Sequence, residues 1–128
     1  MSLSLQRIIQ FVEELIEEET YDGEEGVWKF ADGSHCSVCV NSALRIAREF
    51  DGSVMGYWSN SNPTARIGGS ICEGHDFAFI TGRWIVDYWS FRVARVLSSP
   101  VLDLDSESDS KLATRLFGER DAWEVLTV

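Results

Sequence analysis

Three residues of this 128-residue chain have the types, and the order along the sequence, of a nucleophile, a general base and an orienting acid: Cys36, His75 and Asp87. A thiol becomes a strong nucleophile once it ionises, and a nearby imidazole can take its proton. A carboxylate behind the imidazole fixes the tautomer of the ring. These residues predict a catalytic triad that attacks an acyl carbon and forms a thioester on Cys36.

A predicted hairpin brings two of the three residues together. Segments 74–80 and 84–90 have the composition of strands, and only three residues, one of them a glycine, separate the two segments. A three-residue loop pairs the two residues that flank it. Because side chains alternate between the faces of a strand, Asp87 is then on the same face as His75 and two positions away, within reach of a hydrogen bond.

A predicted helix at about 36–50 positions the thiol. Its apolar residues fall on one face at about 100° per residue, and Cys36 lies at the helix start and in the middle of that face. Unpaired amides and the helix dipole stabilise negative charge at a helix N-terminus, so the pKa of Cys36 should be lowered. Cys39 lies on the same face, and we expect it to be an ordinary core thiol.

The remaining segments predict a single α+β domain over residues 1–128, with an antiparallel sheet packed against the helix that begins at Cys36. Hydrophobic periodicity and turn residues define these segments. They are a helix at 4–19, a loop at 20–35, a strand at 53–58, a long loop at 59–71, a polar connector at 103–110, a short helix near 111–118 and a strand at 122–127.

Several short motifs between residues 33 and 89 resemble the core of papain-like and transglutaminase-like cysteine enzymes. The motifs are Gly33-Ser-His-Cys36, Ala43-Leu44-Arg45, Gly52, Val54-Met-Gly56-Tyr57, Gly74-His75 and Gly82-Arg-Trp84-Ile-Val-Asp87. In addition, Asp87-Tyr88-Trp89 is similar to papain's Asn-Ser-Trp, whose Trp shields the triad from water. The resemblance implies the papain/transglutaminase-like fold. It also implies a thioester that water resolves in a peptidase or deamidase and an amine resolves in a transferase.

Two alternatives remain open. Cys36-x-x-Cys39 and Cys72-x-x-His75 together have the form of a Cys₃His zinc site, so the chain could be a zinc-binding structural module. The chain could also be a catalytically inactive interaction domain of the same fold. Under the triad interpretation, Cys39 and Cys72 are core and loop residues, and neither a metal nor another cofactor is expected.

Composition restricts the partners. The net charge of −10 argues against binding to nucleic acid or to an anionic membrane, since phosphate backbones attract basic surfaces. The sequence contains no apolar run of about 18 residues and no secretory signal. Three cysteines are an odd number, which favours free thiols in a reducing, cytoplasmic location. The predicted attack on an acyl carbon and the resemblance together imply a protein or peptide amide as the substrate; the sequence does not indicate an oligomeric state.

Overall fold

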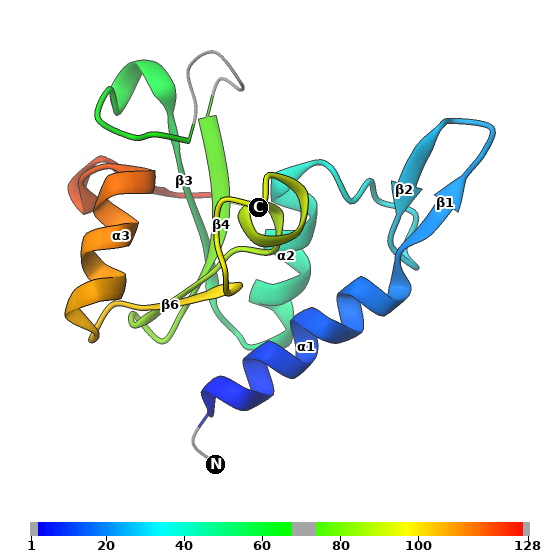
Figure 1. Ribbon diagram of the computed structural model, residues 1–128, viewed down its shortest axis with the longest axis horizontal. Coiled ribbons are helices and arrows are strands. Elements are labelled where there is room, and N and C mark those ends of the chain that lie inside the picture. The colour runs from blue at the N-terminus through cyan, green and yellow to red at the C-terminus, as the bar shows by residue number, and fades with distance from the viewer. Residues whose placement is uncertain (1–2, 68–73, 127–128) are drawn as a thin grey trace.

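The computed structural model describes residues 3–67 and 74–126 (Figure 1). Its helices are α1 (Leu5–Glu18), α2 (Cys39–Glu49) and α3 (Glu107–Phe117), with 3₁₀ turns at Ser59–Ser61 and Arg120–Ala122 and a π-helix at Trp89–Val93. Its strands are β1 (Thr20–Asp22), β2 (Val27–Lys29), β3 (Ser53–Trp58), β4 (Gly74–Ile80), β5 (Trp84–Val86), β6 (Val101–Asp103) and β7 (Glu124–Val125). None of the described helices is long and apolar enough to span a membrane.

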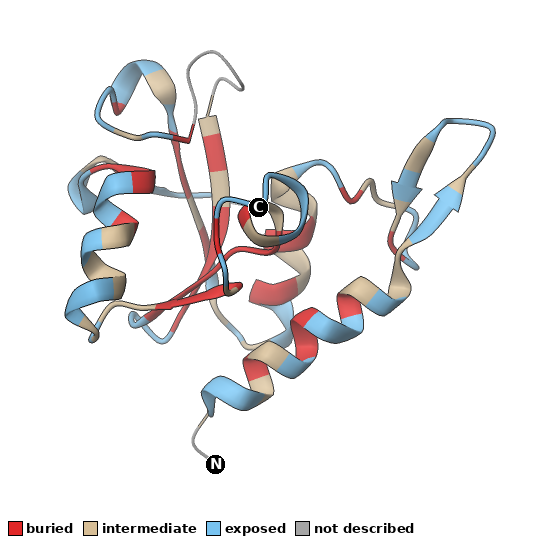
Figure 2. Ribbon diagram, in the orientation of Figure 1, coloured by how far each residue is buried: buried red, intermediate tan, exposed pale blue. Residues whose placement is uncertain are grey.

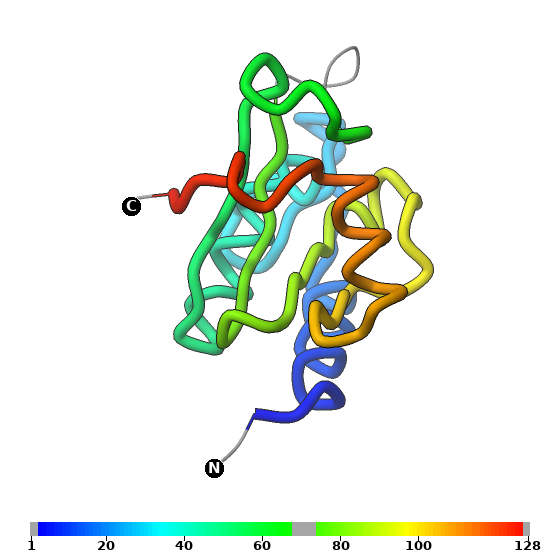
Figure 3. Tube along the Cα trace, turned by 90° about the vertical axis from the view of Figure 1, so that its left-hand side faces the viewer, coloured from blue at the N-terminus to red at the C-terminus, as the bar shows by residue number. Residues whose placement is uncertain are grey.

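Five strands form one antiparallel sheet in the order β6-β5-β4-β3-β7, and β1 and β2 form a separate hairpin. The sheet is the middle of three layers, with α1 and α2 on one face and α3 on the other (Figures 1 and 3). The expected α+β class, with an antiparallel sheet packed against a helix, is therefore confirmed.

Strand β4 shows how the sequence divides the two cores. Side chains alternate along a strand, so Ala78 and Ile80 face the α1 and α2 side while Phe77 and Phe79 face the α3 side. Figure 2 shows the resulting buried residues along the sheet and on the inner faces of the helices. The β1–β2 hairpin, in contrast, is largely exposed or half-buried.

The predicted start of the central helix is wrong by three residues. Helix α2 begins at Cys39, whereas Cys36 lies in the turn before it. The reason is tertiary: the amide of Cys36 donates to the carbonyl oxygen of Trp28 at 2.9 Å, and His35 forms a β-bridge with Lys29. The hairpin thus keeps residues 35 and 36 outside the helix.

Other boundaries also differ from the sequence-based elements. The expected loop at 20–35 contains the β1–β2 hairpin, and α3 begins four residues before position 111 because Ser106 caps it, accepting from the Asp109 amide at 3.4 Å. The expected strand 84–90 ends at Val86, after which the chain turns into the π-helix. The pairing across the three-residue loop, Ile80 with Trp84, is confirmed.

Candidate functional site

The predicted contact between His75 and Asp87 is present. The imidazole Nε2 lies 2.6 Å from the carboxylate Oδ2, and both side chains are almost completely buried. Strand β5 pairs with β4 only as far as Ala78 and Val86. The part of β4 before Ala78, which contains His75, therefore has no strand beside it on the β5 side. The contact forms at this opening, where Asp87 directly follows the last residue of β5.

The carboxylate of Asp87 is itself held by the start of the π-helix. The Ser90 amide donates to Oδ1 at 2.9 Å, and the Ser90 hydroxyl donates to Oδ2 at 2.6 Å. The amide of Asp87 donates to the carbonyl oxygen of Pro100 at 2.8 Å. Sequence reasoning missed Ser90, although an acid and a hydroxyl three residues apart are a common capping pattern.

Aromatic rings surround the imidazole. The ring centroid of His75 lies 5.1 Å from that of Trp89 and 5.6 Å from that of Phe117, which stacks on it at an interplanar angle of 17°. The Trp89 indole also donates to the carbonyl oxygen of Ser37 at 2.8 Å, which ties the π-helix to the turn before α2. Trp89 therefore covers the imidazole, in the way expected from its position after Asp87.

The imidazole of His75 is held in its charged form. Burial lowers its pKa, but the Asp87 carboxylate, through charge and hydrogen bonding, and the sulfur of Cys39 together raise the pKa to about 10. The second ring nitrogen, Nδ1, is buried and has no hydrogen-bond partner within the described part of the chain. One nitrogen is thus fixed by an acid, and the other is enclosed within the protein.

Cys39 occupies the helix-start position that the sequence analysis gave to Cys36. It is half-buried, and its Sγ lies 3.9 Å from Oδ2 of Asp76. Val38 precedes the helix, and its apolar side chain accepts no hydrogen bond from the first amides of α2. Such amides stabilise a thiolate. The expectation that Cys39 is an ordinary core thiol does not fit this position.

Cys36 lies in a different environment. It is 4% exposed, and burial raises the pKa of its thiol. A hydrogen bond with Tyr88 lowers this pKa, but the carboxylates of Glu19 and Asp32 raise it further. The expected lowering of the Cys36 pKa is therefore wrong, because an apolar and acidic environment replaces the helix terminus.

The four residues of the alternative zinc site are only partly described, since Cys72 lies outside the described residues. Among the residues that are described, no group of three or more His, Cys, Asp or Glu side chains is arranged to hold a metal ion. The Nε2 of His75 is already bonded to Asp87.

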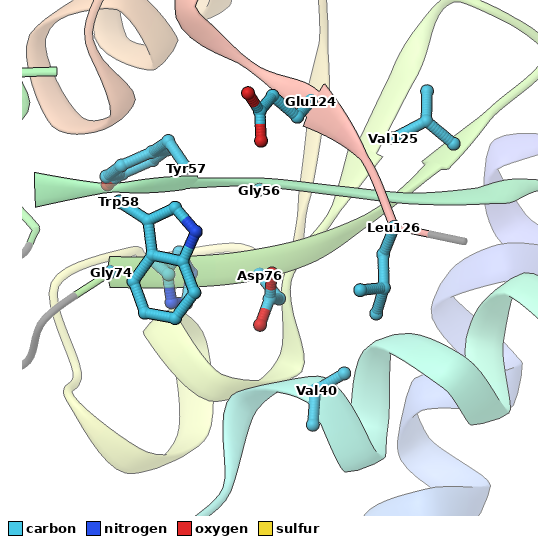
Figure 4. Close-up of a pocket in the computed structure, with 10 residues that line it drawn as sticks. Val40, Gly56, Tyr57, Trp58, Gly74, Asp76, Glu124, Val125 and Leu126 are labelled. Atoms are coloured by element: carbon cyan, nitrogen blue, oxygen red, sulfur yellow. The ribbon is translucent and has the colours of Figure 1, made fainter. Parts of the chain in front are cut away.

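A groove of about 450 Å³ is lined by residues of α2, β3, β4 and β7 (Figure 4). His75 and Asp76 line it from β4, and Val40 lines it from α2, next to Cys39. Burial raises the pKa of Asp76, while the nearby His75 and Cys39 side chains lower it. The groove therefore adjoins the strand that carries His75 and the helix that begins at Cys39.

Comparison of the chain with protein-family models, with curated proteins and with solved structures found no match. The resemblance to papain-like and transglutaminase-like enzymes therefore stays a prediction, and the function is argued from the site itself.

Proposed function

We propose that this protein is a cysteine-dependent acyl-transfer or hydrolytic enzyme that works through a thioester on Cys39. The observation that carries the proposal is the state of His75. Its Nε2 is fixed by Asp87 at 2.6 Å, its Nδ1 is buried and unpartnered, and the sulfur of Cys39 is close enough to raise its pKa. An imidazolium with one nitrogen oriented by an acid and a thiol close by can stabilise the thiolate and later give a proton to the leaving group.

The nucleophile in this proposal is Cys39 rather than Cys36. Cys39 is half-buried, begins α2 and influences the imidazole, whereas Cys36 is buried beside Tyr88 with a raised pKa. A nucleophile must be reachable by the substrate. The half-buried Cys39 meets this requirement better than Cys36, which is buried and has a raised pKa.

The chemistry balances with these residues alone. The thiolate of Cys39 attacks the acyl carbon of an amide, and the His75 imidazolium gives its proton to the leaving amine, so that the C–N bond breaks and a thioester remains. Neutral His75 then takes a proton from water or from an acceptor amine, which attacks the thioester and releases the thiolate. The amides at the start of α2 are suited to stabilise the oxyanion of each tetrahedral intermediate.

The substrate class is a protein or peptide amide. With water as acceptor the enzyme is a peptidase or deamidase, and with an amine it is a transferase. The papain/transglutaminase-like fold fits this chemistry. Asp87 and Ser90 are positioning residues in this scheme, because they act through the imidazole.

Site-resolved acylation tests the proposal. The protein is treated with p-nitrophenyl acetate, and each cysteine is followed by peptide mass spectrometry, in parallel with iodoacetamide alkylation at pH 6. Cys39 should be modified at least tenfold faster than Cys36, because Cys39 is half-buried at the start of α2, whereas burial raises the pKa of the Cys36 thiol. His75→Ala should slow modification of Cys39 at least tenfold.

Matched alanine variants complete the test. Cys39→Ala should abolish release of p-nitrophenol above the background rate, and Cys36→Ala should retain it. Modification of Cys36 ahead of Cys39, or equal rates for both thiols, would contradict the assignment. If both cysteines react no faster than in the urea-unfolded chain, the domain is catalytically inactive.

A further inference from the structure

A second groove, the α3 groove, has a volume of about 740 Å³. Its walls come from α3, from the π-helix and the residues that follow it, and from the loop after β3. The apolar side chains that line it are those of Ile67, Trp89, Ala94, Val96, Leu112 and Leu116. A cavity of this size, lined mainly by apolar side chains with a few polar groups, is typical of a small-molecule site.

Hydrogen bonds fix one wall of the α3 groove. The amide of Ile67 donates to the carbonyl oxygen of Leu116 at 2.9 Å, and the Ile67 carbonyl oxygen accepts from the Tyr57 hydroxyl at 2.5 Å. The buried side chain of Asn62 donates to the carbonyl oxygen of Phe117 at 2.6 Å. These bonds fasten the loop after β3 to the last turn of α3 (Figures 1 and 3). The wall is therefore formed before any ligand binds, which lowers the cost of binding.

The same bonds bring two arginines together in the α3 groove. Arg66 directly precedes Ile67 and Arg115 directly precedes Leu116, so the Ile67–Leu116 bond keeps the two arginine Cα atoms at most about 12 Å apart. Neither arginine takes part in an ion pair in residues 3–67 and 74–126, although the chain contains 21 acidic residues. Two such guanidinium groups repel each other and favour an anion between them, which they can bind bidentately.

The walls of the α3 groove suit an aliphatic chain better than a peptide. The amides of Ile67, Ala94 and Val96 already donate to carbonyl oxygens of the protein itself, and the carbonyl oxygens of Ile67 and Leu116 already accept hydrogen bonds. An extended peptide would therefore find few partners here for its own backbone groups, and burying them without partners is costly. An aliphatic chain has no such groups to satisfy.

We propose that the α3 groove binds a free fatty acid, with its carboxylate between Arg66 and Arg115 and its aliphatic chain on the apolar walls. Trp89 is part of those walls, and its ring centroid also lies 5.1 Å from that of His75. The bound chain thus contacts the indole that covers the imidazole. The fatty-acid site does not use the thiol of Cys39, so this inference is independent of the proposed function.

Octanoate binding to the full chain at pH 7, measured by isothermal titration calorimetry, tests the proposal. Octan-1-ol, the neutral control of the same length, should bind at least tenfold more weakly, because it lacks the charge-assisted bonds to the arginines. Butanoate has four fewer methylene groups and should bind about fiftyfold more weakly, since each buried methylene contributes up to about a fourfold gain in affinity. In NMR spectra, octanoate should shift the indole signal of Trp89.

Matched variants test the residues of the α3 groove. Arg66→Gln and Arg115→Gln should each raise the Kd for octanoate at least fivefold. Arg48→Gln should bind as the wild type, because Arg48 lies in the last turn of α2 just as Arg115 lies in the last turn of α3. Val96→Ser should weaken binding severalfold, whereas Val93→Ser, at an exposed position that does not line this groove, should not. Equal affinity of wild type and Arg115→Gln for octanoate, or equal affinity of the wild type for octanoate and octan-1-ol, would overturn the proposal.

Two further measurements separate this inference from a lipid surface and from the proposed function. The protein should not sediment with phosphatidylcholine vesicles, with or without phosphatidylglycerol; sedimentation that Arg115→Gln removes would identify a membrane surface as the occupant and overturn the fatty acid. Cys39→Ala should bind octanoate as the wild type does. Such binding together with no acylation of wild-type Cys39 would refute the enzyme and leave the fatty-acid site standing, and acylation of Cys39 without octanoate binding would refute the fatty-acid site alone.

Discussion

The charge of the His75–Asp87 pair should control how stability depends on pH. The pKa of His75 is raised from its ordinary value of 6.5 to about 10; burial opposes this rise, and the Asp87 carboxylate is the main cause of it. Each tenfold change in proton affinity corresponds to about 1.4 kcal/mol, so the charged pair contributes roughly 3–5 kcal/mol to folding. Because the folded pKa is the higher one, this contribution is complete below pH 6.5 and is lost as the pH rises towards 10.

Asp87→Asn removes the charge while keeping the shape of the side chain. At pH 6 the variant should be less stable than the wild type by roughly 3–5 kcal/mol, because a buried imidazolium loses its partner. Near pH 10, the pKa of the wild-type imidazole, about half of the rings have lost the proton and most of the charge-dependent contribution is gone. The difference should then fall to about 1 kcal/mol, the cost of the altered hydrogen bonds to Ser90.

Urea unfolding followed by tryptophan fluorescence, at intervals from pH 6 to pH 10, measures this difference. Burial also raises the pKa values of Cys36 and Tyr88, which reduces the stability of both proteins at high pH; the comparison cancels that effect. Asp103→Asn alters an exposed pair with Arg83, and its stability should change with pH in the same way as that of the wild type. A difference between Asp87→Asn and wild type that stays constant from pH 6 to pH 10 would refute the charged pair.

Two further substitutions probe the shell of the site. Ser90→Ala removes the 2.6 Å hydrogen bond to Asp87. The variant should be less stable in urea unfolding by about 1–3 kcal/mol, and the pKa of His75, measured by NMR titration, should fall. An unchanged His75 pKa would show that Ser90 does not position the acid. Gly56→Ala puts a Cβ 2.1 Å from Oδ1 of Asp76 and 2.6 Å from the His75 carbonyl oxygen, so it should cost about 1–3 kcal/mol in urea unfolding. Wild-type stability would contradict the close approach.

The His75–Asp87 contact could be predicted because its geometry is local. The two residues belong to one hairpin, and the length of its loop fixes the register that brings them together. The sequence could not reveal that the second strand ends at Val86, because the π-helix that replaces it is held by tertiary contacts, including the bond from the Trp89 indole to the Ser37 carbonyl. Ser90 was missed for the same reason.

The first residue of the central helix was harder to predict, because a helical pattern looks nearly the same after a shift of three residues. Three steps of about 100° return a side chain to within about 60° of its starting direction, so Cys36 and Cys39 share one face. Periodicity therefore identified the buried face but not the first residue of α2. That residue depends on the amide of Cys36, which bonds to Trp28 in a hairpin that was expected to be a loop.

The position of the thiol relative to the imidazole depends on a segment outside the regular sheet. Between Gly74 and Phe77, β4 pairs with β3 on one side but not with β5 on the other. The chain after β5 supplies Asp87 to the imidazole at this open edge, and its Trp89 binds the turn that leads into α2. The same short segment therefore holds the imidazole and the entry to the thiol-bearing helix. Because β5 ends at Val86, residues from the two faces of the sheet can meet at one opening in it.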